Sequence, residues 1–361
     1  MQRIRVERMT YFRKNIDAMA AYTPGEQPGP DERVVKLNTN ENPYPPSPRV
    51  LEVLRGTDWS ALRKYPDPMA NKVRDAVARQ FGVRREEVLC GNGSDELLRL
   101  AVTAFVAEGD ALAYPTPTYS LYPVLAEIQG ARAIEIPSPD DFSLPVDALA
   151  KAKARLLFIC NPNAPTGVWT RPEVIADLAD RAKGVVVVDE AYADFAPASA
   201  LAAVRGRPNV LVFRTLSKSY SLAGIRLGFA IGPEPLIAGL AKVKDSYNID
   251  AVRIEVGAAA IEDQAYTRAT VEKVKAERSR LAKELAALGF ACLPSEANFI
   301  LACVPGGDAK GCYERLKARG ILVRYWNQPR LADKLRITVG TPDENDALLR
   351  ALAARKKETS A

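Results

Sequence analysis

The stretch NVLVFRTLSKSYSLAGIRLGFAIG, residues 209–232, places Lys218 in a polar loop between two apolar runs. The runs, Val210 to Phe213 and Leu227 to Ile231, are short and rich in branched and aromatic residues, which predicts buried strands. A charged side chain is rarely buried without a partner. We therefore expect a bound group to occupy Lys218, with Arg226 following eight residues later in the same loop.

The segments that flank this stretch alternate between strand and helix patterns. Residues 86–105, EEVLCGNGSDELLRLAVTAF, predict a strand, a glycine turn and a helix, and residues 184–192, GVVVVDEAY, predict a strand without polar alternation. Continuous β-branched runs are typical of parallel sheets covered by helices on both faces. The sequence therefore predicts an α/β fold whose large domain contains a mostly parallel, doubly wound sheet.

Three regions are expected along the chain. Residues 1–34 form a proline-rich N-terminal arm that packs against the small domain or a partner subunit, and residues 35–246 form the large domain. Residues 247–361 form a smaller α+β domain, which begins with a long charged helical stretch from about Arg253 to Leu288. Its strands are expected in CLPSEANFILACVP (292–305), ILVRYW (321–326) and KLRITVG (334–340).

Composition narrows the function classes. The 361 residues include no histidine, which excludes His-dependent nucleophilic catalysis and His-based metal sites, and no metal is expected. Five scattered cysteines suit a reducing cytoplasm.

No apolar run reaches the ~18 residues that span a bilayer, and residues 1–8 lack the apolar core of a signal peptide. The net charge of +6 is spread along the chain, so neither nucleic acid nor membrane is an expected partner.

Two further motifs follow predicted strands. In CGNGSDE, residues 90–96, a glycine turn precedes a helix start near Ser94, where backbone N–H groups bind anions, although Ser94 could equally be an ordinary N-cap. Asp189 ends a buried strand, where open α/β sheets bind ligands, although it could simply cap the next turn. Tyr192 follows three residues later and could point into the same crevice.

Together these motifs match the requirements of one cofactor. Pyridoxal phosphate needs a lysine for a Schiff base, an acid that keeps the pyridine nitrogen protonated, and a phosphate cup. Lys218, Asp189 and the turn at Ser94 and Asp95 supply these groups, and Arg226 completes the cup because arginine bonds two phosphate oxygens at once. Without histidine, acid–base work falls to groups such as Lys218.

Nearly the whole chain resembles fold-type-I, class II aminotransferases, and most closely the histidinol-phosphate aminotransferase family. The resemblance rests on motifs that include KLNTNENPYPPSP, YPDP, GNGSDE, PTYSLY, NPNAPTG, DEAYADF, SKSYSLAGIRLGF, EANFIL and LRITVGT. It implies transamination between histidinol phosphate and 2-oxoglutarate in histidine biosynthesis, with ping-pong kinetics and a cytoplasmic homodimer. An aromatic amino-acid aminotransferase and a threonine-phosphate decarboxylase remain alternatives on the same fold. A cofactor-sensing DNA-binding regulator is disfavoured because too few residues precede the first sheet segment.

The resemblance also implies a role for each matching residue. Lys218 carries the cofactor and shuttles the proton, while the other cofactor contacts are Ser94, Asp95, Tyr119, Asn163, Asp189, Tyr192, Ser217, Arg226 and, from the neighbouring subunit, Tyr65. Tyr22, Arg324 and Arg336 close over the substrate, and the two arginines bind its phosphate. One position departs from the family pattern. Ala164 stands where the family usually has an asparagine that bonds the cofactor's phenolic oxygen, so Asn163 or Asn161 could compensate or Tyr192 could act alone.

Overall fold

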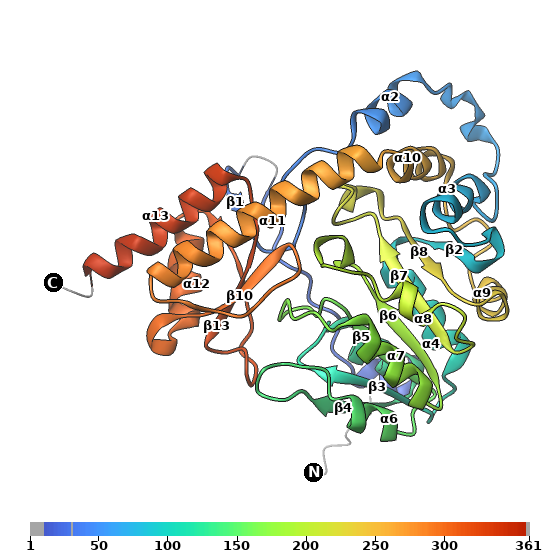
Figure 1. The fold of residues 1–361 in the computed structure, drawn as a ribbon, viewed down its shortest axis with the longest axis horizontal. Coiled ribbons are helices and arrows are strands. Elements are labelled where there is room, and N and C mark those ends of the chain that lie inside the picture. The colour runs from blue at the N-terminus through green and yellow to red at the C-terminus, as the bar shows by residue number, and fades with distance from the viewer. Residues whose placement is uncertain (1–10, 30–31, 359–361) are drawn as a thin grey trace, which may run out of the picture.

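A seven-stranded sheet forms the centre of the large domain (Figure 1). Its strands, in spatial order, are β2 (Val88–Gly91), β8 (Gly228–Ile231), β7 (Val210–Thr215), β6 (Val185–Asp189), β5 (Leu156–Cys160), β3 (Ala111–Thr116) and β4 (Arg132–Pro137). The five strands from β7 to β4 are parallel, whereas β8 runs antiparallel to both β7 and β2. The predicted mostly parallel α/β fold is confirmed. Because β8 is reversed, β2 and β7 end at the same edge as β6.

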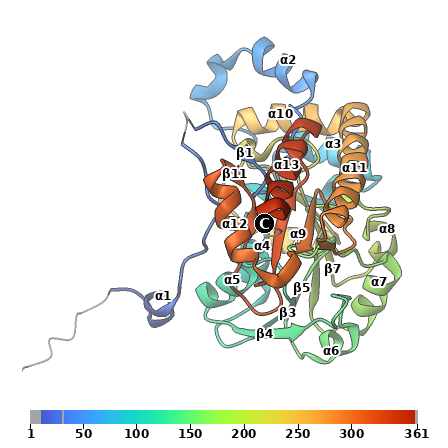
Figure 2. The same cartoon turned by 90° about the vertical axis from the view of Figure 1, so that its left-hand side faces the viewer.

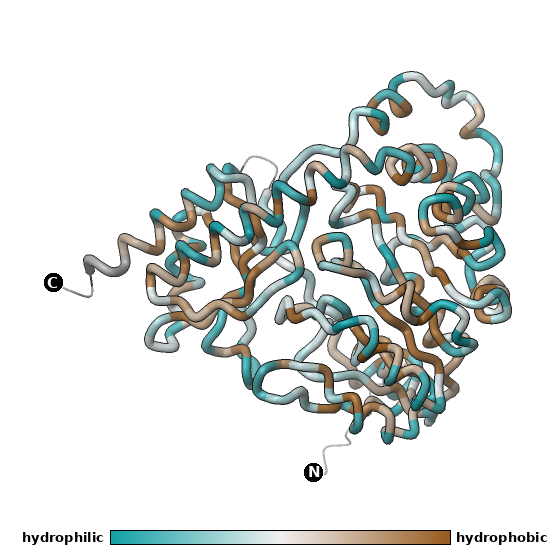
Figure 3. The backbone as a smooth tube through the Cα atoms, viewed as in Figure 1, coloured by the Kyte–Doolittle hydropathy of each residue, from teal (hydrophilic) through white to brown (hydrophobic). Residues whose placement is uncertain are grey.

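Helices cover both faces of this sheet, as the unbroken apolar strands predicted. One face packs against α4 (Gly93–Phe105), α5 (Leu121–Gln129) and α9 (Glu234–Ala241), and the other against α6 (Val146–Lys151), α7 (Pro172–Arg181) and α8 (Leu201–Val204). Successive strand residues alternate between these layers, so that Phe158 packs into the first and Ile159 into the second. Figure 3 shows the resulting apolar strands inside a more polar surround.

The long helical stretch expected from Arg253 to Leu288 is divided into two helices. They are α10 (Ala251–Glu262) and α11 (Gln264–Ala287), and Asp263 lies between them. The Asp263 carboxylate accepts a hydrogen bond from the backbone N–H of Tyr266 and so caps α11. At the β2–β8 end of the sheet, α10 packs with α2 (Pro48–Gly56) and α3 (Asn71–Phe81). The predicted domain boundary near residue 246 remains a prediction.

The small domain contains an antiparallel sheet with the order β12 (Arg324–Tyr325), β13 (Lys334–Thr338), β10 (Phe299–Cys303) and β9 (Ala291–Cys292). Helices α11, α12 (Ala309–Ala318) and α13 (Pro342–Glu358) lie beside it (Figure 1). A separate parallel pair joins β1 (Val35–Lys36) to β11 (Ile321–Leu322), so ILVRYW contributes to two strands and not one. The 3₁₀ turns are η1 (Trp59–Arg63), η2 (Arg85–Glu87), η3 (Ala193–Phe195), η4 (Ala223–Ile225) and η5 (Pro305–Gly307).

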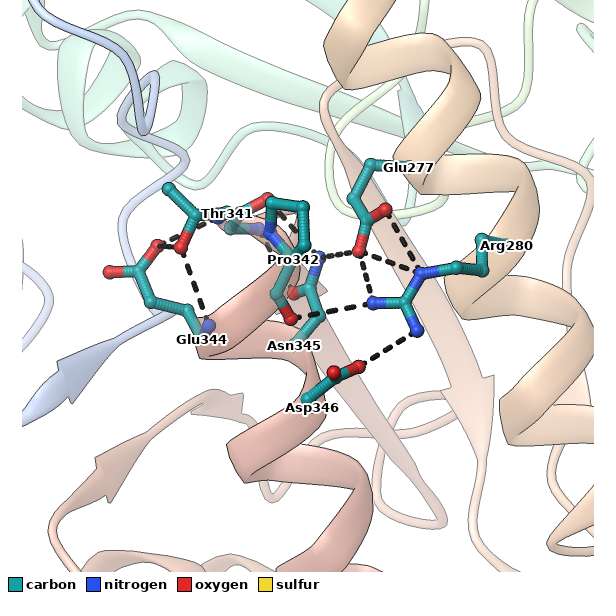
Figure 4. A network of polar contacts seen from close by, with 8 residues as sticks. Glu277, Arg280, Thr341, Pro342, Glu344, Asn345 and Asp346 are labelled. Atoms are coloured by element: carbon teal, nitrogen blue, oxygen red, sulfur yellow. Dashed lines mark hydrogen bonds and ion pairs between the residues drawn. The ribbon is translucent and has the colours of Figure 1, made fainter.

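A polar network fixes the start of α13 against α11 (Figure 4). The Asn345 amide donates to Glu277 at 2.9 Å, and Arg280 forms ion pairs with both Glu277 and Asp346. Burial opposes ionisation of Glu277, but the hydrogen bonds from Arg280 and Asn345 hold the pKa of its carboxyl below the ordinary value. Since β13 leads directly into α13, this network also fixes the end of β13.

The computed structural model describes the backbone of residues 11–29 and 32–358 and the side chains up to residue 354. Residues 1–10, which carry the prediction about a signal peptide, and residues 30–31 of the arm lie outside the described part. Within the arm, α1 (Lys14–Ala18) rests against α5, where the Asn15 amide donates to the carbonyl of Glu127 at 2.6 Å (Figure 2). Among the described helices, none combines the length and apolarity that crossing a membrane requires.

Candidate active site

A cavity of about 1000 Å³ opens at the edge where β3, β5, β6 and β7 end. The large domain supplies its floor, the segment 38–40 and the arm supply one wall, and residues of the small domain supply the opposite wall. The predicted residues that line it are Tyr22, Ser94, Asp95, Tyr119, Asp189, Tyr192, Ser217, Lys218, Arg226, Arg324 and Arg336. Residues more than 300 positions apart in the chain therefore meet in one place.

Lys218 lies in the loop between β7 and β8, and its Nζ donates to the carbonyl of Thr39 at 3.0 Å. Burial lowers the pKa of its amine to about 8, and the nearby positive charge of Arg336 contributes to the shift. A buried ion network holds this loop. Arg214 of β7 pairs with Glu190 at 2.7 Å and with Asp194, and the Ser219 hydroxyl donates to Asp194. With this pKa, about a tenth of the Lys218 amine is neutral at pH 7, which is far more than for an ordinary lysine and is the form that a nucleophile or base needs.

Asp189 occupies the last position of β6 and is 2% exposed. Its carboxylate accepts hydrogen bonds from the Tyr122 hydroxyl at 3.1 Å and from the Ala191 N–H at 3.2 Å. Burial nevertheless raises the pKa of Asp189 to about 6, because two donors do not replace the lost water. A cationic partner in the cavity would favour its ionised form. The sequence interpretation missed Tyr122, although PTYSLYP places it three residues after Tyr119, within reach of the same helix face.

The predicted anion cup is formed by the first turn of α4 and the loop before β8. Gly93 has a φ of +76°, which favours glycine, and a Cβ there would come within 2.7 Å of the Arg226 guanidinium and displace it. Arg226 donates to the Ser217 hydroxyl at 3.2 Å and pairs with the Asp95 carboxylate at 3.2 Å. Backbone N–H groups at the start of α4, a hydroxyl and a guanidinium thus converge, and these donors fit a phosphate group.

Two tyrosines complete this part of the cavity. The Tyr119 hydroxyl donates to Asp95 at 3.1 Å, and its ring lies edge-on to Tyr122 with centroids 5.7 Å apart. The Tyr192 hydroxyl accepts a hydrogen bond from the Asn40 amide at 2.9 Å, and burial raises the pKa of Tyr192. Lys218 Nζ lies 5.8 Å from the Tyr192 ring centre. Two aromatic rings and the lysine therefore surround a space suited to a flat ring.

Arginines of the small domain line the opposite wall. Arg336 of β13 donates to the carbonyl of Asn38 at 2.8 Å, while its Nε is buried without a hydrogen-bond partner among the described residues. Arg324 of β12 donates to the carbonyls of Thr23 and Pro24 in the arm at 3.1 Å each. The ring of Trp326 lies 5.3 Å from one guanidinium and 5.1 Å from the other. Two neighbouring guanidinium groups on this wall are suited to binding an anion.

One contact predicted for this chain's own cavity, Asn163, is not brought to it. The amide of Asn163 donates to the Pro117 carbonyl and to Thr166, and it accepts from Thr118, so Ala164 and not Asn163 lines the cavity. Asn161 is also engaged, because its amide bonds the backbone of Thr170. Tyr65 is 82% exposed and stacks on Tyr247 with centroids 4.5 Å apart, outside the residues that line this chain's cavity.

The fold and the paired anion sites around a buried lysine and acid define a class of enzyme. The chain belongs to the class I and II aminotransferases, and the family model "Aminotransferase class I and II" matches residues 32–352. It is 50% identical to histidinol-phosphate aminotransferase 1 of Nostoc sp. over 342 residues, which cover 95% of this chain and 97% of the relative. The histidinol-phosphate aminotransferase of Syntrophotalea carbinolica is 45% identical over 345 residues, covering 96% and 99%.

Solved structures show the same similarity. The histidinol-phosphate aminotransferase of Sinorhizobium meliloti, in complex with pyridoxal-5'-phosphate, superposes with a TM-score of 0.87 at 26% identity, covering 95% of this chain and 97% of that one. N-succinyldiaminopimelate aminotransferase of Mycobacterium tuberculosis superposes with a TM-score of 0.80 at 27% identity, covering 89% and 93%. The fold therefore serves more than one amino donor, and the substrate follows from the site and not from the fold.

Proposed function

We propose that the chain binds pyridoxal phosphate and uses it to transfer the amino group of histidinol phosphate to 2-oxoglutarate, in either direction. One observation carries this proposal: Lys218, Asp189 and the donor set at Ser94, Ser217 and Arg226 all line one cavity. The lysine amine, the buried acid and the phosphate donors are the three groups that the cofactor requires. The choice of substrate is based on the relatives at 50% and 45% identity, which are named histidinol-phosphate aminotransferases.

When bound, pyridoxal phosphate withdraws electrons from the carbon that carries the amino group. Asp189 would support this chemistry because its carboxylate, which accepts a hydrogen bond from Tyr122, would pair with a protonated ring nitrogen. The cup at the start of α4 would hold the phosphate through Ser217, Arg226 and backbone N–H groups. Tyr119, which lines the cavity, would lie against one side of the ring, and Tyr192 would donate its hydroxyl proton to the phenolic oxygen.

Lys218 is the acid–base group of this proposal. Its pKa of about 8 lets Nζ accept a proton from the substrate carbon and return it to the cofactor near neutral pH. The chain contains no histidine that could share the task. The Thr39 carbonyl accepts a hydrogen bond from Nζ and so directs the amine toward the cavity. One residue therefore both holds the cofactor and moves the proton.

The substrate's phosphate is assigned to the arginines of the small domain. Arg336 and Arg324 both line the cavity, and the Arg324 guanidinium bonds the arm carbonyls of Thr23 and Pro24. Guanidinium groups bind phosphate oxygens in pairs. Tyr22, which is half exposed and lies 6.3 Å from the Tyr119 ring centre, would close over the bound substrate. Glutamate and 2-oxoglutarate use the same arginines through a carboxylate.

The proposal includes a homodimer that works in the cytoplasm. The exposed Tyr65–Tyr247 stack supports the dimer, because a pair of large aromatic rings on the surface is typical of protein interfaces. Tyr65 would then reach the phosphate in the neighbouring subunit's cavity. Sedimentation of the purified protein, with Tyr65→Phe tested for weaker cofactor binding, examines this part separately.

A substrate panel tests the function. Purified protein supplied with pyridoxal phosphate should show visible absorbance that Lys218→Ala abolishes, and histidinol phosphate should be turned over faster than phenylalanine. Release of CO₂ from phosphothreonine would instead support a decarboxylase, and faster turnover of phenylalanine would support an aromatic aminotransferase. Coupled activity retained in Lys218→Ala would contradict the role of Lys218.

A further inference from the structure

Three consecutive residues contact three different functional side chains. The Asn38 carbonyl accepts from Arg336 at 2.8 Å, the Thr39 carbonyl accepts from Lys218 Nζ at 3.0 Å, and the Asn40 amide donates to Tyr192 at 2.9 Å. This segment follows β1 and so belongs to neither sheet that supplies those side chains. The sequence interpretation assigned it no role. Arginine and lysine can only donate, whereas an amide and a hydroxyl can each donate or accept. For the contact between Asn40 and Tyr192, the surrounding hydrogen bonds determine which group donates.

Asn40 is fixed by the small domain. It is 1% exposed and has a φ of 58°, a left-handed conformation that asparagine tolerates better than most residues. Its backbone N–H donates to Thr338 Oγ1 at 3.0 Å, and its carbonyl accepts from the Asn298 amide at 2.9 Å. Thr338 closes β13, the strand that carries Arg336, so the position of Asn40 depends on the position of the substrate-binding strand.

These contacts set the orientation of the Asn40 amide. The Thr338 hydroxyl accepts from the Asn40 N–H, so its own proton is directed to Asn40 Oδ1 at 3.1 Å. With Oδ1 bonded to Thr338, Nδ2 must face Tyr192 and donate to it. A tyrosine hydroxyl has one proton to give. Because its oxygen accepts from Asn40, that proton points away from Asn40, which leaves it for a group in the cavity.

We propose that Asn40 is a positioning residue that orients the Tyr192 hydroxyl as a donor to the cofactor's phenolic oxygen, and that Thr338 extends this control to the small domain. The inference rests on the proposed cofactor. Ala164 lines the cavity with a methyl group that cannot donate to the phenolic oxygen, and the amide of Asn163 is bonded elsewhere. Tyr192 is then the donor to that oxygen, so the direction of its proton matters.

Asn40→Asp is the sharpest test because it keeps the shape and the tolerance of a positive φ. An ionised carboxylate only accepts, so Tyr192 would turn its proton toward residue 40. The cofactor's phenolate would lose its donor, and its neighbouring Lys218-bound nitrogen would hold a proton more tightly. One hydrogen bond corresponds to about one pH unit. We expect the midpoint of the visible-absorbance pH titration to rise by about one pH unit beyond any effect of the added charge.

The Tyr192→Phe background separates the two effects. Phenylalanine has no proton to redirect, so Asn40→Asp should shift the midpoint there by the charge effect alone, and the shift should be smaller than with Tyr192 present. Equal shifts in both backgrounds would overturn the proposal. Thr338→Val provides a neutral second variant, because it frees the amide to flip and should raise the midpoint only when Tyr192 is present. A midpoint that Thr338→Val leaves unchanged would also contradict it.

The same measurements distinguish this inference from the proposed function. If the wild-type protein gains no visible absorbance with pyridoxal phosphate, the proposed function fails before Asn40 is tested. If the wild-type protein binds the cofactor and Asn40→Asp has the same absorbance midpoint as the wild type, the role proposed for Asn40 is wrong and the proposed function stands. Cofactor dissociation constants, measured by equilibrium dialysis, should rise several-fold in Asn40→Asp. An unchanged dissociation constant together with an unchanged midpoint would overturn the inference.

Discussion

The hydroxyl of Tyr122 donates to the carboxylate of Asp189 at 3.1 Å, and both side chains are buried. Tyr122 belongs to α5 and Asp189 ends β6, so the contact joins a helix of one layer to the floor of the cavity. The hydrogen bond favours the ionised form of the acid, whereas burial opposes it more strongly and raises the pKa of Asp189 to about 6. The strength of the acid therefore depends on a residue outside the cavity lining.

Tyr122→Phe should weaken the enzyme without destroying it. The change removes one donor to a buried charge, which is worth about 1.5–3 kcal/mol, so kcat/KM should fall about tenfold or more. Cofactor affinity should fall with it. Tyr266→Phe is a control, because its hydroxyl donates to the Pro45 carbonyl and not to Asp189, and Tyr266 does not line the cavity. Equal losses in the two variants would show that the contact with Asp189 is unimportant.

Asp189→Asn should stabilise the protein without cofactor while abolishing activity. The folded-state pKa of Asp189, about 6, exceeds the ordinary 3.8. The contribution of protonated Asp189 to folding stability is therefore fully present below about pH 4 and is lost as the pH rises through about 6. Removing the charge should restore about 2 kcal/mol at pH 7, after allowing for one lost hydrogen bond. Urea unfolding at pH 4 and pH 7 measures this. A variant less stable than wild type at pH 7 would contradict the prediction.

The reaction of Lys218 with pyridoxal phosphate should follow the fraction of neutral amine. Burial places its pKa at about 8, below the ordinary 10.5, so the rate of cofactor uptake should rise with pH and level off above about 8. Arg336→Met removes a nearby positive charge that also lowers this pKa, so the midpoint of the rate–pH profile should move to higher pH. Stopped-flow absorbance across pH 6 to 10 gives both midpoints. An identical midpoint in the variant would exclude coupling between Arg336 and Lys218.

Arg336→Ala should raise KM for histidinol phosphate much more than it weakens cofactor binding. Arg336 lines the cavity together with Arg324, and the phosphate cup is formed by other residues. Loss of a guanidinium–phosphate contact costs about 2–3 kcal/mol, which corresponds to a 30- to 150-fold rise in KM. Arg226→Ala is the complementary variant and should chiefly weaken cofactor binding. A weaker cofactor complex with an unchanged KM in Arg336→Ala would remove Arg336 from the substrate site.

Sequence patterns were most informative where a local rule applies. The run Val185–Val188 identified a buried parallel strand and placed Asp189 at its end, because a strand covered on both faces has no polar alternation. The glycines before Ser94 indicated a helix start that binds anions, and the turn has the required positive φ at Gly93. The contacts missed were long-range. Tyr122 and Asn40 bond partners 67 and 152 residues away, at distances that no local pattern encodes.

The sequence by itself determined the main elements of the large domain and the chemical types of its site: the apolar strands, the glycine turn, the lysine in the loop between two apolar runs and the absence of histidine. These follow from local backbone preference and side-chain chemistry. Only the tertiary structure decided how those groups are tuned. Reversal of β8 brings the loops of Ser94 and Lys218 to one edge, burial moves the pKa values of Lys218 and Asp189 toward neutrality, and Asn40 bonds Tyr192. Desolvation and hydrogen-bond direction depend on what surrounds a side chain, and those surroundings come from residues far away in the chain.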